Sequence, residues 1–178
     1  MTPKNGANGF TLTELLIAIA LAGILAGLSG PSLLNSWNNE KLNSSSKLVI
    51  SWLEQARKRS LQNSTACFTE LQSSNASLKT VCLDQPSNVS ELLINEQLPN
   101  LKDISFTIKQ STSCTVEGSA YTHCVSFTPR GTTNTSLNLE LRLGATGSSG
   151  RCIAVMEPIG LIRSGKLRSN TCIYTTSY

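Results

Sequence analysis

The stretch that decides the fold is NGFTLTELLIAIALAGILAGLSGP, residues 8–31. After a small-residue start it runs apolar, and its only ionisable side chain is that of Glu14. The 25 residues from Phe10 to Leu34 would measure about 37 Å as an α-helix rising about 1.5 Å per residue. A bilayer core is about 30 Å thick, so we expect residues 10–34 to form a hydrophobic helix that spans a membrane or lies in the core of a filament.

The order of small and apolar residues differs from that of an ordinary secretory signal. Such a signal has a basic leader, a short apolar core and small residues after the core. Here Gly6, Ala7 and Gly9 precede the core, and Lys4 is the only basic residue of the leader. Cleavage after Gly9 would remove residues 1–9, keep the apolar helix in the mature chain and create a new α-amino group at Phe10.

A carboxylate inside an apolar segment is costly, and by default it indicates a function. The new amino group at Phe10 of a neighbouring subunit could pair with Glu14, which would set the axial register of packed helices. The alternative is an interfacial Glu14 whose carboxylate reaches water.

The segment GFTLTELL at residues 9–16, followed by the apolar helix and Pro31, resembles the class III signal of type IV pilins and type II secretion pseudopilins. The family often has Ile where this chain has Thr13. The resemblance implies cleavage by a prepilin peptidase between Gly9 and Phe10, N-methylation of Phe10, and a role of Glu14 in assembly.

The same resemblance implies partners, a location and a helix irregularity at Gly30-Pro31. The partners would be other pilins or minor pilins and an inner-membrane assembly platform. The subunit would cross the bacterial inner membrane once before assembly and then lie in a surface pilus or a periplasmic pseudopilus. The resemblance implies no cofactor.

Residues 35–63 continue the helix in amphipathic form beyond Pro31, where the missing hydrogen bond predicts a kink or local melting. Apolar residues recur at three- and four-residue steps, which predicts a stripe that covers a sheet. These are Leu34, Trp37, Leu42, Leu48, Val49, Trp52, Leu53, Ala56 and Leu61. We expect Asn38–Lys47 to be exposed, the two tryptophans to be core or interface anchors rather than binding aromatics, and Arg57-Lys58-Arg59 to be a solvated helix end.

Residues 64–178 show short runs broken by Ser, Asn, Gly and Pro, a pattern typical of a β-rich head. The expected strands are Ala66–Leu71, Lys79–Leu83, Ile104–Lys109, Cys124–Phe127, Leu137–Leu143, Cys152–Glu157 and Leu161–Ile162, with a short helix at Ser90–Gln97. The predicted class is α+β, with one long N-terminal helix packed on an antiparallel β-sheet.

Six cysteines in an exported head indicate disulfides, which implies an oxidising compartment. No two have the Cys-x-x-Cys spacing of a zinc site, and His123 is the only histidine. Fifteen pairings are possible, and we expect neighbours to pair: Cys67–Cys82, Cys114–Cys124 and Cys152–Cys172. The alternative is that some cysteines are reduced and buried.

The resemblance extends into the head. The segment LVISWLEQARKRSLQN resembles the helix end of the FimT/GspH-like minor pilins and pseudopilins. The segments SFTPRGTTNTSLNLEL and GRCIAVMEPIGLIRSG resemble the F-x-P-x-G segment and the terminal hairpin of that group. The implied function is that of a minor pilin or of a type II secretion pseudopilin.

The positive charge of the chain is concentrated near its C-terminus. Residues 1–129 hold nine basic and nine acidic side chains, whereas residues 130–178 hold six basic and two acidic ones. DNA-binding members of the FimT-like group have a terminal G-R-x-R motif, and here Gly160–Arg163 has Leu161 in place of the first arginine. Five residues later, Gly165-Lys166-Leu167-Arg168 offers similar chemistry in a shifted place. Arg163, Lys166 and Arg168 are therefore candidate contacts to double-stranded DNA during DNA uptake, in an expected basic loop between Cys152 and Cys172, and the alternative is a solvated basic turn that contacts neighbouring subunits.

Nothing in the sequence predicts catalysis or a metal site. Gly144, Gly147 and Gly150 lack the strand–loop–helix context of a phosphate-binding loop and indicate a turn. No nucleophile motif accompanies the one histidine. We therefore expect a structural subunit rather than an enzyme.

Overall fold

The computed structural model describes residues 10–94, 104–116, 118–144 and 150–174, without the side chains of residues 26, 28–32, 35 and 119. Gly9 therefore lies outside the described residues. The chain divides into two compact units, Met1–Asn38 and Asn39–Tyr178.

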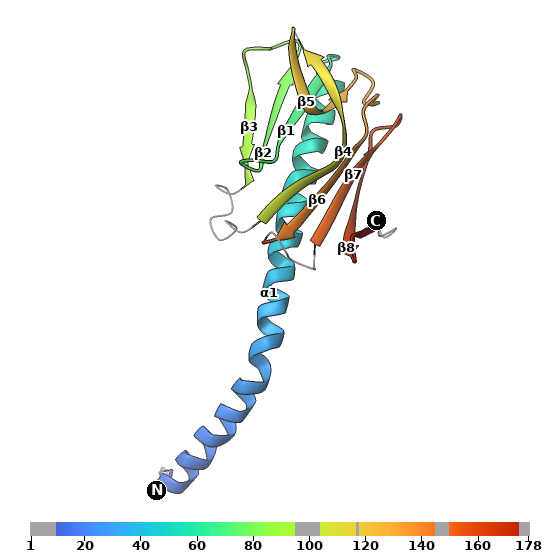
Figure 1. Ribbon diagram of the computed structural model, residues 1–178. Coiled ribbons are helices and arrows are strands. Elements are labelled where there is room, and N and C mark those ends of the chain that lie inside the picture. The colour runs from blue at the N-terminus through green and yellow to red at the C-terminus, as the bar shows by residue number, and fades with distance from the viewer. Residues whose placement is uncertain (1–9, 95–103, 117, 145–149, 175–178) are drawn as a thin grey trace, which may run out of the picture. The chain divides into compact units, whose positions relative to one another are not determined.

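One helix, α1 (Leu12–Gln62), contributes residues to both units (Figure 1). Its backbone is helical at Gly30 and Pro31, so the local melting expected there is wrong, while the expected kink stays a prediction. A proline removes one hydrogen bond of the ladder, and the turns on either side keep theirs. Among the described residues, no helical stretch combines the length and the hydropathy of a membrane-crossing helix.

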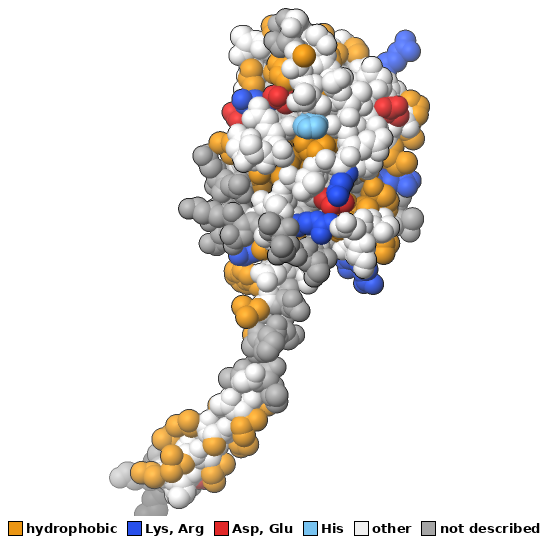
Figure 2. All heavy atoms as spheres, viewed as in Figure 1, with side chains coloured by type: hydrophobic (Ala, Val, Ile, Leu, Met, Phe, Trp, Pro, Cys, Tyr) orange, Lys and Arg blue, Asp and Glu red, His pale blue; other side chains and the backbone are white. Residues whose placement is uncertain are grey.

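The first unit exposes its apolar side chains, as Figure 2 shows along its surface. Phe10 is 87% exposed, Leu12 75% and Trp37 63%. Leu34, also exposed, and Trp37 belong to the first unit, whereas the members of the expected stripe from Leu42 onward belong to the second. Leu34 and Trp37 both precede Asn39, where the second unit begins.

The second unit carries an antiparallel sheet with nine strands among the described residues, in the order β3-β2-β1-β5-β4-β6-β7-β8-β9 (Figure 1). The strands are β1 (Cys67–Gln72), β2 (Ser77–Cys82), β3 (Ser90–Leu93), β4 (Ile104–Val116), β5 (Ser119–Phe127), β6 (Leu137–Leu143), β7 (Gly150–Met156), β8 (Leu161–Arg168) and β9 (Thr171–Tyr174). The first half of β4 pairs with β6 and the second half with β5, so β4 joins the two sides of the sheet. The predicted α+β class, a long N-terminal helix with an antiparallel sheet, is confirmed.

One segment expected to begin a helix is a strand, and the last predicted strand is longer than expected. Ser90–Leu93 is not the start of a helix but strand β3, which pairs with β2, and residues 95–97 lie outside the described residues. Strand β8 extends from Leu161 to Arg168 and pairs with β9 on its second side. Ser169 and Asn170 both have positive φ, the geometry of a two-residue hairpin turn with the twist of the flanking strands.

The helix buries one apolar stripe against the sheet, and this stripe and the facing apolar side chains of the sheet form the core. Leu42, Val49, Leu53 and Ala56 are at most 2% exposed and cluster with Phe127 and residues of β2, β4, β6 and β7. The expectation that Asn38–Lys47 is solvated is therefore wrong at its centre, since Leu42, Ser45 and Ser46 are buried. Burial of apolar surface of this kind is the main stabilising term of a domain.

Arg57 is not part of a solvated helix end. Its Nε donates to the carbonyl of Gly131 at 2.8 Å, and its Nη2 donates to the carbonyl of Ile159 at 3.1 Å. Gly160 has φ +66°, and a Cβ there would lie 2.8 Å from the Gly131 carbonyl oxygen, so only glycine fits. The three segments that carry the resemblance thus meet at Arg57, Gly131 and Gly160.

All three expected disulfides are present: Cys67–Cys82, Cys114–Cys124 and Cys152–Cys172. Each joins two strands that are neighbours in the sheet or one strand apart in the order, namely β1 to β2, β4 to β5 and β7 to β9. No cysteine is left free.

Candidate functional site

The start of α1 is a reciprocal helix cap. Thr11, which precedes the helix, donates its backbone N–H and its hydroxyl to Oε2 of Glu14, each at 2.9 Å, and the Glu14 N–H donates to the Thr11 hydroxyl at 3.3 Å. This is the Thr-x-x-Glu capping box, which satisfies two backbone N–H groups that the first helical turn cannot pair. The Thr-x-x-Glu spacing is visible in the sequence, and it gives Glu14 a capping role in addition to the expected role in assembly.

The cap leaves half of the carboxylate available. Among the described residues, hydrogen bonds reach Oε2 of Glu14 and none reaches Oε1. Phe10, four positions before Glu14, is fully accessible at 87% exposure. The geometry is therefore compatible with a helix whose Glu14 caps its own chain through one oxygen and receives a cation from outside through the other.

The candidate DNA contacts do not form a loop. Arg163, Lys166 and Arg168 all lie on strand β8, and all three are exposed. Side chains alternate between the two faces of a strand, and the β7–β8 register is unbroken. Lys166 and Arg168 therefore share one face, and Arg163 lies on the other.

The face of Lys166 and Arg168 is the one turned toward the helix. In the register, Lys166 is opposite Arg151 of β7, whose Nε donates to Oδ1 of Asn43 on α1 at 2.8 Å. Burial lowers the pKa of Arg151, and the charge of Glu40 acts in the opposite direction. The guanidinium stays charged at neutral pH, because the ordinary pKa of arginine lies far above neutrality.

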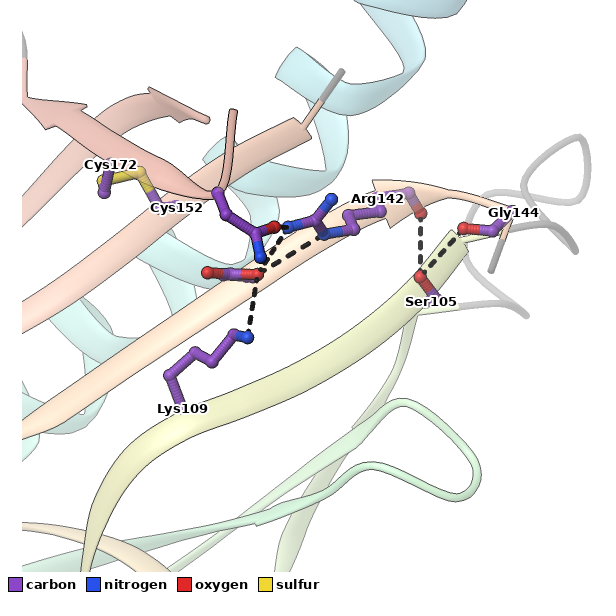
Figure 3. A network of polar contacts seen from close by, with 8 residues as sticks. Ser105, Lys109, Arg142, Gly144, Cys152 and Cys172 are labelled. Atoms are coloured by element: carbon purple, nitrogen blue, oxygen red, sulfur yellow. Dashed lines mark hydrogen bonds and ion pairs between the residues drawn. A yellow bond between two sulfur atoms is a disulfide. The ribbon is translucent and has the colours of Figure 1, made fainter. Parts of the chain in front are cut away.

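A polar network that sequence reasoning missed lies on the opposite face of the sheet. Glu140 of β6 is 7% exposed, and its Oε2 accepts a hydrogen bond from Nη2 of Arg142 at 3.0 Å. Nζ of Lys109 on β4 lies 3.9 Å from the same oxygen (Figure 3). Arg142 also donates to Oδ1 of Asn170 at the β8–β9 turn. In Figure 2, basic and acidic side chains lie together on this face.

The β8–β9 hairpin curls over that network. The hydroxyl of Tyr174 donates to Oδ1 of Asn138 on β6 at 3.3 Å, although β7 and β8 lie between these strands in the sheet order. Beneath the hairpin is a cavity of about 360 Å³ lined by Glu140, Asn170, Tyr174 and other residues of the network. Arg142 donates to both Glu140 and Asn170, and Asn138 is bonded to Tyr174 and Gln110. These contacts favour a role of the network in holding the hairpin in place.

The missed network had one signal in the sequence. Residues 137, 139, 141 and 143 of β6 are all leucine, and the polar residues between them fall on the opposite face. What the alternation could not show is that a hairpin folds over Glu140. Among the described residues, no group of three or more His, Cys, Asp or Glu side chains is placed to hold a metal ion.

Comparisons with known proteins agree with these features. Residues 4–30 match the family model of the prokaryotic N-terminal methylation motif. The fold is similar to that of the type IV minor pilin FimU of Pseudomonas aeruginosa, with a TM-score of 0.51 and 14% identity over 78% of this chain and 96% of that one. No curated protein matches the sequence significantly. The chain therefore carries a prokaryotic N-terminal methylation motif, and its fold is similar to that of a type IV minor pilin.

Proposed function

We propose that the chain is a minor-pilin-type subunit that a prepilin peptidase cleaves after Gly9 and that enters a filament through the first half of α1. The observation that carries the proposal is the exposure of the apolar side chains that follow the methylation motif. Leu15, Leu16, Ile17, Ile19 and Leu21 are 56–62% exposed, whereas soluble monomers rarely expose a continuous apolar surface of this extent. Helices of neighbouring subunits, or lipid before assembly, would cover it.

Glu14 supports the same proposal. A neighbour's α-amino group at Phe10 would meet the free Oε1 of Glu14, and both charges would be relieved inside an apolar bundle. Phe10 and Glu14 would then act as a pair between subunits, while Thr11 and Glu14 act as a pair within one.

The test uses two matched variants in the native host. Glu14→Gln keeps the capping box but removes the charge, and Thr11→Ala removes the cap but keeps the carboxylate. We expect Glu14→Gln to lower incorporation into sheared filaments at least tenfold and Thr11→Ala to leave most of it. Equal incorporation of Glu14→Gln and the natural chain would contradict the proposed pairing.

The filament is proposed to be a type IV pilus rather than a pseudopilus of a type II secretion system, because the similar solved structure is named a type IV minor pilin. Deletion of the gene should therefore affect surface pili and not the secretion of exported enzymes. The opposite result would favour the pseudopilus.

We do not extend the proposal to DNA binding or to catalysis. Arg163 points to the opposite face of β8 from Lys166 and Arg168, so the three cations do not form one surface for a duplex. DNA binding stays a prediction from the sequence, which a gel shift of the three Gln variants would test.

A further inference from the structure

One end of the head is basic, and the contacts of α1 with the sheet and its loops identify that end. Helix α1 and strand β7 run in the same direction through the head, because Asn43 contacts Arg151 near the start of β7 and Arg57 contacts Ile159 just beyond its end. Arg151, Lys166 and Arg168 therefore lie at the end of the head where Asn39 enters it. We call these three residues the basic edge.

The two outer cations of the basic edge have no partners of their own. Among the described residues, the side chains of Lys166 and Arg168 make no hydrogen bond and no ion pair, and both are exposed. The Nε of Arg151 donates to Asn43, and the negative charge of Glu40 acts to raise the pKa of Arg151. The basic edge therefore carries an excess of positive charge that is exposed to the surroundings of the head.

The connectivity of the chain shows which segment is joined to this end of the head. Asn39, at this end of the head, follows Asn38 directly, and Asn38 ends the unit whose apolar side chains are exposed. Whatever the orientation of the two units, the basic edge is the end of the head that is tethered to the apolar segment. A surface that receives this segment is therefore held at high effective concentration beside the edge.

We propose that the basic edge contacts an anionic phospholipid surface while the apolar segment is held in a membrane, before the subunit enters a filament. The inference rests on the proposed membrane stage of the function. Each cation near an anionic leaflet raises the equilibrium constant for contact with the leaflet about fivefold, so Lys166 and Arg168 together raise it roughly 30-fold. The contact is screened within about 10 Å at 0.1 M salt, so it weakens as salt rises.

Free DNA offers similar phosphate chemistry but is not tethered to the chain. The lipid surface is favoured for that reason, and because the outward cation Arg163, which would help to grip a duplex, lies on the other face of β8. Release of the edge would accompany extraction of the subunit from the membrane.

The test uses the full chain in nanodiscs of phosphatidylcholine, with or without phosphatidylglycerol, and a gadolinium-chelating lipid as a paramagnetic probe. We expect the amide signals of residues 164–170 to broaden with phosphatidylglycerol, and those of residues 128–131 at the far end of the head to stay sharp. Lys166→Gln combined with Arg168→Gln should reduce the contact roughly 30-fold and abolish the broadening. Arg163→Gln, on the opposite face, is the matched control and should keep it.

The outcomes separate the two proposals. A chain that does not remain with the nanodiscs would contradict the membrane stage and the inference together. A chain that remains, but shows equal broadening with and without phosphatidylglycerol or none at all, would overturn the inference alone. Broadening or shifts of residues 164–170 with duplex DNA and not with phosphatidylglycerol would make DNA the partner and would also overturn it.

Discussion

The two halves of α1 belong to one helix but have opposite surroundings. The described large apolar side chains of residues 12–37 are more than half exposed, whereas Leu42, Val49 and Leu53 are at most 1% exposed. The first half is apolar around its whole circumference, and the second is apolar along one stripe. A helix that is apolar on all sides needs partners outside the chain, whereas an amphipathic one finds its partner in the chain's own sheet.

The largest expected effect separates the two halves directly. Leu53→Ala should destabilise the head by about 2–5 kcal/mol, because it removes a side chain that is fully buried against the sheet. Leu16→Ala, at a 59% exposed position, should change the free energy of unfolding by less than about 0.5 kcal/mol and should instead lower filament incorporation. Urea unfolding of the full chain in detergent, followed by Trp52 fluorescence, measures both. Equal losses of stability would break the comparison.

Arg57 sharpens the picture of the docked half at its far end. Arg57→Ala should cost about 1–3 kcal/mol, because the carbonyls of Gly131 and Ile159 lose their charged donor. Lys58→Ala, one residue along and exposed, is the control and should be nearly neutral. The comparison of urea midpoints tests the difference, and a neutral Arg57→Ala would mean that the two loops are fixed without it.

Asn43 tests where the docked half begins. Asn43→Ala removes the acceptor of Arg151 Nε and should destabilise the head by about 1 kcal/mol. Glu54→Ala, at an exposed helical position, should have little effect in the same thermal unfolding experiment. If the two variants behave alike, the head would begin later than Asn39.

The smallest effect is expected at the helix start. Thr11→Ala removes the cap, so amides of the first turn should exchange hydrogen roughly fivefold faster, while the unfolding of the head stays unchanged. Hydrogen exchange followed by mass spectrometry resolves the two regions. A shift in head unfolding would show that the two halves are energetically coupled.

Much of this division could be predicted from the sequence, because it rests on local patterns. The apolar run and the alternation in β6 each predict a local structure, and the predicted α+β class rests on such patterns. The Thr-x-x-Glu cap is equally local, because Thr11 and Glu14 are only three residues apart.

What could not be predicted depends on distant contacts or on strand limits. The two acceptors of Arg57 are 74 and 102 residues away, so nothing near Arg57 in the sequence marked it. Strand β8 continues through Gly165, although glycine is disfavoured in strands. A strand that ended before Gly165 would not have predicted that Arg163 and Lys166 lie on opposite faces. Gly165 is required because a Cβ there would lie 2.5 Å from the carbonyl oxygen of Ile173.

The disulfide pattern has a consequence for export. Each cysteine pairs with the next one along the chain, at separations of 15, 10 and 20 residues. In a head translocated N-terminus first, each pair would be complete before the first cysteine of the next pair follows. An oxidase that joins thiols in order of arrival would then make the native set without a later isomerisation.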